Sequence, residues 1–259
     1  MRLVGAPYSP WTEKARWALD HHAHAYAFRV YTPVLDEPWL RFATRNFSRK
    51  PATIPVLFDG RATLTDSFAI ARHADAKGAR SKLFPASQIA AIEAWNERSE
   101  RALRAGRALS FARLDDDAEA QIDFLPSFIP KPLLPYLRGA MGPTIAFLRK
   151  KHGIDEALLA RAHEELDAAL DGLREALAGR PHLLDELSYA DLAMAVVFQF
   201  VKPVDDRHVP LTRSHRRCFS EPELARKHGD LLEWRDRLYA AHRRPGVSSS
   251  APPCSVETR

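Results

Sequence analysis

The sequence has few cysteines and no long apolar run. Its two cysteines, Cys218 and Cys254, are isolated and match neither a disulfide framework nor zinc-binding spacing. No run of about eighteen apolar residues occurs, so no membrane-spanning helix is expected. The opening MRLVGAPYSP lacks the apolar core of a secretory signal. These absences predict a soluble, cytoplasmic protein with no integral membrane segment.

Charge of one sign is not concentrated anywhere in the chain. The net charge is +5, and basic charge of this size can steer anionic ligands or nucleic acid. The charged residues, however, follow the expected helices in mixed-sign patterns, and no cluster combines basic with aromatic residues. We therefore expect no nucleic-acid partner. The 46% apolar content is typical of a globular protein with a core.

The first 78 residues mix strand and helix patterns. Short apolar runs alternate with helical spacing, and Ser9-Pro10 is a typical helix start, with serine as the cap. A hairpin turn is expected at Asp59-Gly60. The expected elements are strands at 2–6, 26–31, 55–58 and 62–64, and helices at 11–22, 36–46 and 67–77.

The rest of the chain shows helical patterns only. Helices are expected at 87–113, 155–178, 188–201 and 220–242, and the apolar stripe of the second contains Leu159, Ala162, Leu166, Ala169, Leu170, Leu173 and Leu177. Ser188 with Asp191, and Ser220 with Glu223, match capping boxes. The predicted class is α/β plus all-α.

This change of pattern predicts the domain organisation. We expect an N-terminal domain over residues 1–80, an all-helical domain over 87–244, and a boundary between the two near 81–87. The Pro/Ser-rich residues 245–259 are expected to be disordered.

The segment TIPVLFDGRATLTDS, residues 53–67, suggests a peptide-binding site. Pro55 at the head of a strand is compatible with a cis bond, which would turn the Ile54 main chain outward to pair with an extended ligand. A plain turn proline is the alternative. Asp66 and Ser67 start a helix, whose N-terminus binds carboxylates. Asp66 would then meet an ammonium group, or would only cap the helix.

Three segments resemble the cytosolic glutathione transferase family. KPATIPVLFDGRATLTDSFAIARHAD is similar to the family's segment in which a cis-proline precedes a hairpin and an acid-Ser pair opens a helix. LLDELSYADLAMAVV resembles its capped helix, and SEPELARKHGDLLEWRDRLYAAHRRP its last helix. The resemblance covers most of residues 1–243 and is poorest over the proline-rich stretch from about 115 to 152.

The resemblance implies a thioredoxin-like, glutathione-binding N-terminal domain and a homodimer. Ile54, with Pro55, would pair with the cysteinyl residue of glutathione. Asp66 and Ser67 would hold the γ-glutamyl end, and Lys50 would neutralise the glycine carboxylate. The implied activity is a transferase in detoxification, in which the glutathione thiol attacks an electrophilic small molecule or a peroxide.

Such an enzyme must lower the pKa of the thiol, because the thiolate is the nucleophile. A hydroxyl at a helix N-terminus does this, and the first helix offers Ser9, which we favour, then Tyr8, then Thr12. A purely structural cap at Ser9 is the alternative. No cysteine lies where the first strand meets the first helix, which argues against the family's cysteine-type members.

Residues His21, His22 and His24 are not expected to bind a metal. A non-catalytic glutathione-binding or scaffold protein is the alternative function.

Overall fold

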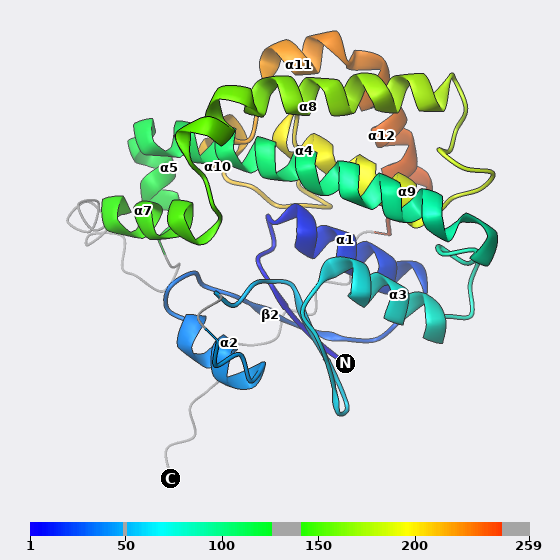
Figure 1. Ribbon diagram of the computed structural model, residues 1–259, viewed down its shortest axis with the longest axis horizontal. Helices are drawn as coiled ribbons and strands as arrows, with labels where there is room; N and C mark the ends of the chain where they lie inside the picture. Colours follow the sequence, from blue (N-terminus) through cyan, green and yellow to red (C-terminus); the bar gives the residue numbers. More distant parts are fainter. Residues whose placement is uncertain (49–50, 126–140, 245–259) are drawn as a thin grey trace. The chain divides into compact units, whose positions relative to one another are not determined.

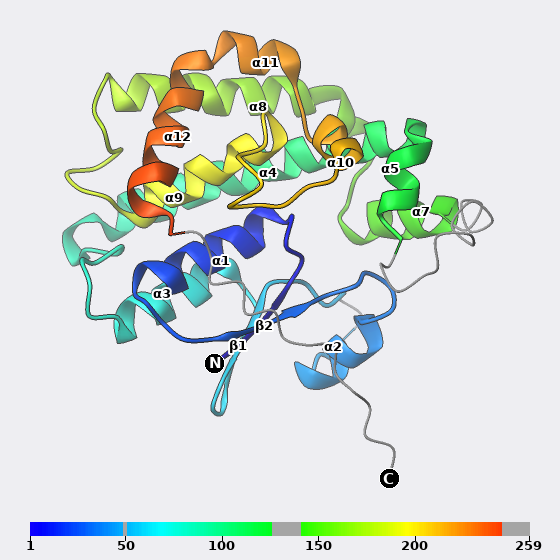
Figure 2. The same cartoon turned by 180° about the vertical axis from the view of Figure 1, so that it is seen from behind.

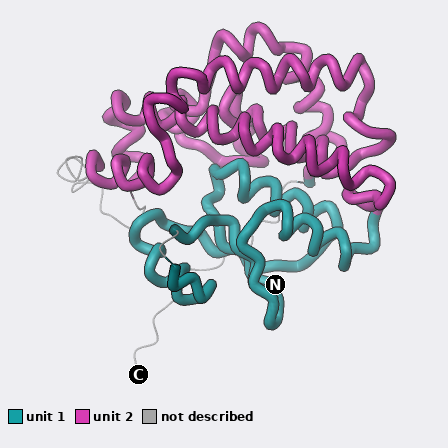
Figure 3. The backbone as a smooth tube through the Cα atoms, viewed as in Figure 1, with its two compact units in different colours: residues 1–80, 244–259 teal, residues 81–243 magenta. Residues whose placement is uncertain are grey.

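The computed structural model describes residues 1–48, 51–125 and 141–244. It divides the chain into two compact units, residues 1–80 with Arg244 and residues 81–243 (Figure 3). Three expectations fall on residues outside the described ranges. They concern Lys50, residues 126–140 of the proline-rich segment 122–152, and the tail 245–259.

The first unit is a four-stranded mixed sheet with three helices. The strand order is β2-β1-β3-β4, in which β1 runs parallel to β2 and antiparallel to β3. The elements are β1 (Arg2–Gly5), α1 (Pro10–His21), β2 (Ala27–Val30), α2 (Glu37–Ala43), β3 (Val56–Asp59), β4 (Ala62–Leu64) and α3 (Ser67–Lys77). This order confirms the predicted alternation of strands and helices.

The hairpin turn lies one residue later than predicted. Asp59 pairs with Ala62, so the two loop residues are Gly60 and Arg61. Gly60 has a φ of +57°, which glycine adopts without steric cost. The carboxylate of Asp59 instead meets Lys77 Nζ at 2.6 Å and His73 Nε2 at 2.8 Å. Hydrogen bonds from these two groups lower the pKa of Asp59 to about 2 and tie the hairpin to α3.

Helices α1 and α3 lie side by side in both ribbon views (Figures 1 and 2). Their C-terminal ends are joined by two histidines, because His22 Nε2 lies 3.0 Å from Asp75 Oδ1 and His24 Nε2 donates to the Ala74 carbonyl at 2.8 Å. A Cβ added at Gly78 would lie 2.0 Å from the His22 ring. These two histidines therefore join helices, and Gly78 leaves room for one of them.

The second unit is built from helices around α4 (Ile89–Asp116). Helix α4 packs against α8 (Glu156–Leu177) and α9 (Tyr189–Ala195). The buried stripe of α8 begins at Leu158 rather than at the predicted Leu159. Among the residues described in this unit, the remaining elements are 3-10 turns at Ala86–Gln88 and Val196–Phe200 and helices α5 (Ala118–Asp123), α7 (Met141–Lys151), α10 (Arg213–Cys218), α11 (Pro222–Lys227) and α12 (Gly229–His242).

The long helices were predicted better than the short ones. Helices α4 and α8 confirm the expected ranges. The range 188–201 is α9 followed by a 3-10 turn, and 220–242 is interrupted at His228 between α11 and α12. Helices α5, α7 and α10 were not predicted.

One of the two predicted capping boxes forms. Asp191 is 0% exposed, and its oxygens accept hydrogen bonds from the amides of Leu183 at 2.8 Å and Ser188 at 2.9 Å. The box predicted at Ser220 is wrong, because the Ser220 hydroxyl donates to the Arg216 carbonyl and Glu221 is the N-cap of α11. Among residues 1–48, 51–125 and 141–244, no helix has both the length and the hydropathy needed to cross a bilayer.

Candidate functional site

The strand register brings the candidate residues of the first unit to one end of the sheet. Val4 pairs with Val56, so counting on along both strands brings Ala6 level with Ile54. Leu57 pairs with Leu64, and the same count brings Asp66 level with Pro55. The start of α1, the residue before Pro55 and the start of α3 therefore leave the sheet at the same end, from the neighbouring strands β1, β3 and β4.

Ser9 occupies the N-cap position of α1, but its side chain does not cap the helix. Its backbone is extended, and its carbonyl accepts the first helical hydrogen bond, from Glu13, at 2.9 Å. The Ser9 hydroxyl is half-buried and has no hydrogen-bond partner in the described part of the chain. The expected capping bond is thus not formed, and the hydroxyl can bind a group from outside the chain.

Close packing fixes the corner that carries Ser9. A Cβ added at Gly5 would come within 2.6 Å of both Cγ2 and Oγ1 of Thr12, so glycine allows the end of β1 to lie against the first turn of α1. Thr12 itself is 0% exposed. Its hydroxyl is therefore buried under β1 and is not accessible to a ligand.

Tyr8 is the other hydroxyl considered for this corner. Burial raises the pKa of Tyr8 to about 12. The phenol therefore stays protonated at neutral pH, and it can act as a hydrogen-bond donor but not as a base.

The Ile54-Pro55 peptide bond is cis. Ile54 packs against an apolar cluster that contains Val4 and Val56. Within the described ranges, neither the amide nor the carbonyl of Ile54 has a hydrogen-bond partner. A main chain that is extended from a strand and unpaired can accept a short extended peptide as an added strand.

Asp66 and Ser67 divide the start of α3 between them. Asp66 is the N-cap, and its Oδ1 accepts a hydrogen bond from the Ala69 amide at 2.9 Å. Ser67 is 2% exposed, and its hydroxyl has no partner among the residues that the structure describes. The capping alternative for Asp66 is therefore realised, while Ser67 and the helix N-terminus offer donors suited to a carboxylate.

Sequence reasoning missed a carboxylate that contacts the chain two residues before Ile54. Glu37 Oε1 accepts a hydrogen bond from the Ala52 amide at 3.0 Å, and Glu37 Oε2 accepts one from the Tyr31 hydroxyl at 2.8 Å. Glu37 begins α2 and looks in the sequence like an ordinary helix-start acid. No local pattern could have identified its contact with a residue fifteen positions away.

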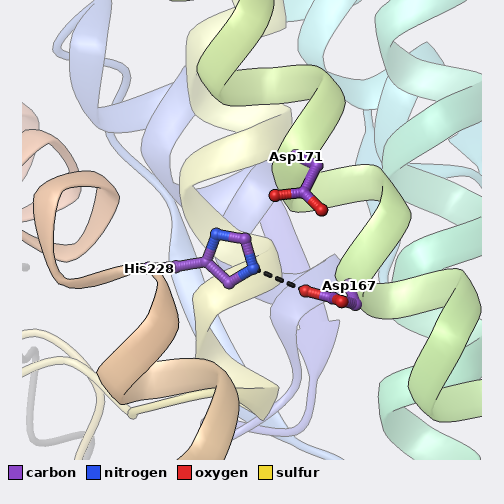
Figure 4. A group of neighbouring side chains, drawn as sticks. All are labelled: Asp167, Asp171 and His228. Carbon is purple, nitrogen blue, oxygen red and sulfur yellow. Dashed lines mark hydrogen bonds and ion pairs between the residues drawn. The ribbon is translucent and has the colours of Figure 1, made fainter.

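A group of Asp167, Asp171 and His228 in the second unit resembles a metal site (Figure 4). Lys227 Nζ, however, lies 2.8 Å from both oxygens of Asp167 and 2.8 Å from Asp171 Oδ2. Arg174 donates to His228 Nδ1 at 2.9 Å, so His228 Nε2 carries the proton that it donates to Asp167 at 2.7 Å. The lysine ammonium thus occupies the position that a metal cation would need, and the group is a charge network between α8 and the α11–α12 junction.

The mixed sheet with its helices and the helical second unit define a thioredoxin-like domain followed by a helical domain. The model of the glutathione S-transferase N-terminal domain matches residues 3–82, and the model of the glutathione S-transferase C-terminal domain matches residues 156–238. The chain belongs to the glutathione transferase family. No curated protein sequence matches it significantly.

Solved structures share the fold at low sequence identity. A glutathione S-transferase from Methylobacillus flagellatus with glutathione bound is 14% identical, with a TM-score of 0.57 and coverage of 92% of this chain and 94% of that one. One from Methylobacterium radiotolerans, in complex with glutathione sulfonate, is 18% identical, with a TM-score of 0.59 and coverage of 100% and 97%. A beta-etherase from Sphingobium is 14% identical, with a TM-score of 0.61 and coverage of 94% and 95%.

Proposed function

We propose that the protein is an enzyme that binds glutathione on its first unit and activates the thiol for attack on an electrophilic small molecule or a peroxide. The observation that carries the proposal is the main chain of Ile54, which has no hydrogen-bond partner among the described residues and lies at the sheet end where α1 and α3 begin. Two relatives in fold hold glutathione or its sulfonate, and the family membership supports the same ligand here.

Each part of glutathione has a complementary group in this proposal. The amide and carbonyl of Ile54 pair with the main chain of the cysteinyl residue. The Ser67 hydroxyl and the N-terminus of α3 bind the γ-glutamyl carboxylate, because free amides and the helix dipole favour an anion there. Asp66 directly precedes Ser67, and in this proposal its carboxylate attracts the γ-glutamyl ammonium. Lys50 for the glycine carboxylate remains a proposal from the sequence alone.

Thiol activation is assigned to Ser9. Its hydroxyl lies at the N-terminus of a twelve-residue helix and has no partner among the described residues, so it can donate to a thiolate. A hydrogen bond to the anion, added to the positive end of the helix dipole, lowers the pKa of a bound thiol. Tyr8 is the second choice, since a protonated phenol can donate in the same way.

Calorimetric titration with glutathione, followed by turnover with a chromogenic aryl halide and with a hydroperoxide, tests the proposal. Binding at micromolar to millimolar glutathione with turnover of either substrate supports it. No binding refutes it. Binding without turnover of either class favours the non-catalytic alternative on the same fold. We also propose a cytoplasmic homodimer, and light scattering should then give twice the chain mass of 29.2 kDa.

A further inference from the structure

The segment that carries Ile54 is fastened to α2 through the Glu37 carboxylate. One carboxylate oxygen accepts from the Ala52 amide at 3.0 Å and the other from the Tyr31 hydroxyl at 2.8 Å. Tyr31 follows β2, and its amide donates to the Gly5 carbonyl at 2.9 Å, which continues the pairing of β1 with β2. Glu37 therefore joins the end of the sheet to the segment before Pro55.

The two donors in this contact are buried, whereas Glu37 itself is partly exposed. Tyr31 is 4% exposed and Ala52 is 3% exposed, and both belong to the apolar cluster against which Ile54 packs. Hydrogen bonds to a carboxylate are stronger than those between neutral groups. Burial and then the hydrogen bond to Glu37 raise the pKa of Tyr31, so the phenol keeps its proton and remains a donor.

We infer that Glu37 is a positioning residue for glutathione, because its carboxylate holds the Ala52 amide and so orients the Ile54 main chain two residues later. This inference rests on the proposed function. The bridge from the Tyr31 hydroxyl through the Glu37 carboxylate to the Ala52 amide is already formed in the protein without ligand, so no free energy is spent on forming it when glutathione binds. A main chain held in its binding geometry loses less conformational entropy on association, and affinity rises accordingly.

The effect is expected on binding and not on the chemical step. Glu37 contacts the segment behind the ligand-binding main chain, so its loss should weaken ground-state and transition-state binding alike. We expect Glu37→Ala to raise the dissociation constant of glutathione about tenfold, the loss of one hydrogen bond to a charged group. The rate at saturating glutathione should stay within about twofold of the wild type.

Two companion variants separate positioning from general loosening of α2. Glu37→Gln keeps an amide oxygen that accepts from Ala52, so it should bind within about threefold of the wild type. Asp36→Ala is the matched control. Asp36 accepts from the Thr32 amide at 2.7 Å and from Arg29 at 3.1 Å, and within the described ranges the Ala52 amide donates to Glu37 and not to Asp36. This variant should lose stability but keep its affinity for glutathione.

Calorimetric titration of the full-length variants, with hydrogen exchange of the Ala52 amide, tests the inference. Weakened binding and faster exchange in Glu37→Ala, but not in Asp36→Ala, support it. Equal affinity of Glu37→Ala and wild type, or equal weakening by Asp36→Ala, overturns it. If Glu37→Ala does not fold, Tyr31→Phe, which removes one arm of the bridge, should bind about threefold more weakly. An unchanged affinity of that variant overturns the inference. Failure of the wild type to bind glutathione instead refutes the proposed function, before any variant is made.

Discussion

Replacing Ser9 by alanine separates the catalytic role of its hydroxyl from a structural one. A free thiol with a pKa of about 8.5 is only about 3% ionised at pH 7. A hydrogen bond to the anion is worth about 2 kcal/mol, or about 1.5 pKa units, which brings the bound thiol to a pKa near 7 and about half ionised. Ser9→Ala should therefore slow the reaction about 15-fold at pH 7 and by less than about twofold at pH 9.

The same substitution should leave stability almost unchanged. Replacing a serine that caps a helix by alanine lowers the free energy of unfolding by about 1 kcal/mol. The Ser9 hydroxyl makes no capping bond, so we expect a change below about 0.5 kcal/mol. The assay is the pH dependence of the rate at saturating glutathione, which reports the pKa of the bound thiol, with urea denaturation of the same samples. An inflection that stays in place in Ser9→Ala would refute the assignment, and one that moves in Tyr8→Phe would transfer it to Tyr8.

Three further predictions concern other parts of the molecule. Asp191→Ala leaves two amides without their acceptor and should lower the free energy of unfolding by about 3 kcal/mol in thermal melts; a loss below about 1 kcal/mol would contradict the capping role. Burial is the main cause that lowers the pKa of His22, so the unfolded chain takes up more protons there. Its contribution to stability should be complete above pH 6.5 and fall as the pH drops through the folded-state pKa; urea midpoints at pH 7.5 and 5 that differ equally in wild type and His22→Gln would contradict this. Ser67→Ala should weaken glutathione binding about fivefold without changing the pH–rate inflection, because the γ-glutamyl end is remote from the thiol; unchanged affinity would exclude Ser67 from the site.

The element order of the first unit followed from local chemistry. Short apolar runs, the Ser9-Pro10 start and the proline at the head of β3 are local signals, and the observed strands and helices agree with them to within a few residues. The hairpin position did not follow, because Asp59 continues the ladder to Ala62 and pairs with α3 side chains from there. Turn propensity alone carries no information on that tertiary contact.

The break at His228 in the helical unit coincides with a tertiary contact. The pattern over 220–242 reads as one helix, but the His228 ring is held by Asp167 and Arg174 of α8, and the chain is helical only on either side of it. In the candidate site, the sequence suggested Ile54, Asp66 and Ser67 as one ligand site, with Ser9 at the start of the first helix as the activating residue. The contact of Glu37 with Ala52 joins residues that share no periodicity, and only the fold reveals it.

A crystal structure of the protein with glutathione bound would show directly whether the Ile54 main chain binds the ligand. We expect the cysteinyl amide and carbonyl within about 3 Å of the Ile54 carbonyl and amide, with the sulfur within about 3.5 Å of the Ser9 hydroxyl. Glutathione bound elsewhere, with the main chain of Ile54 still unpaired, would contradict it.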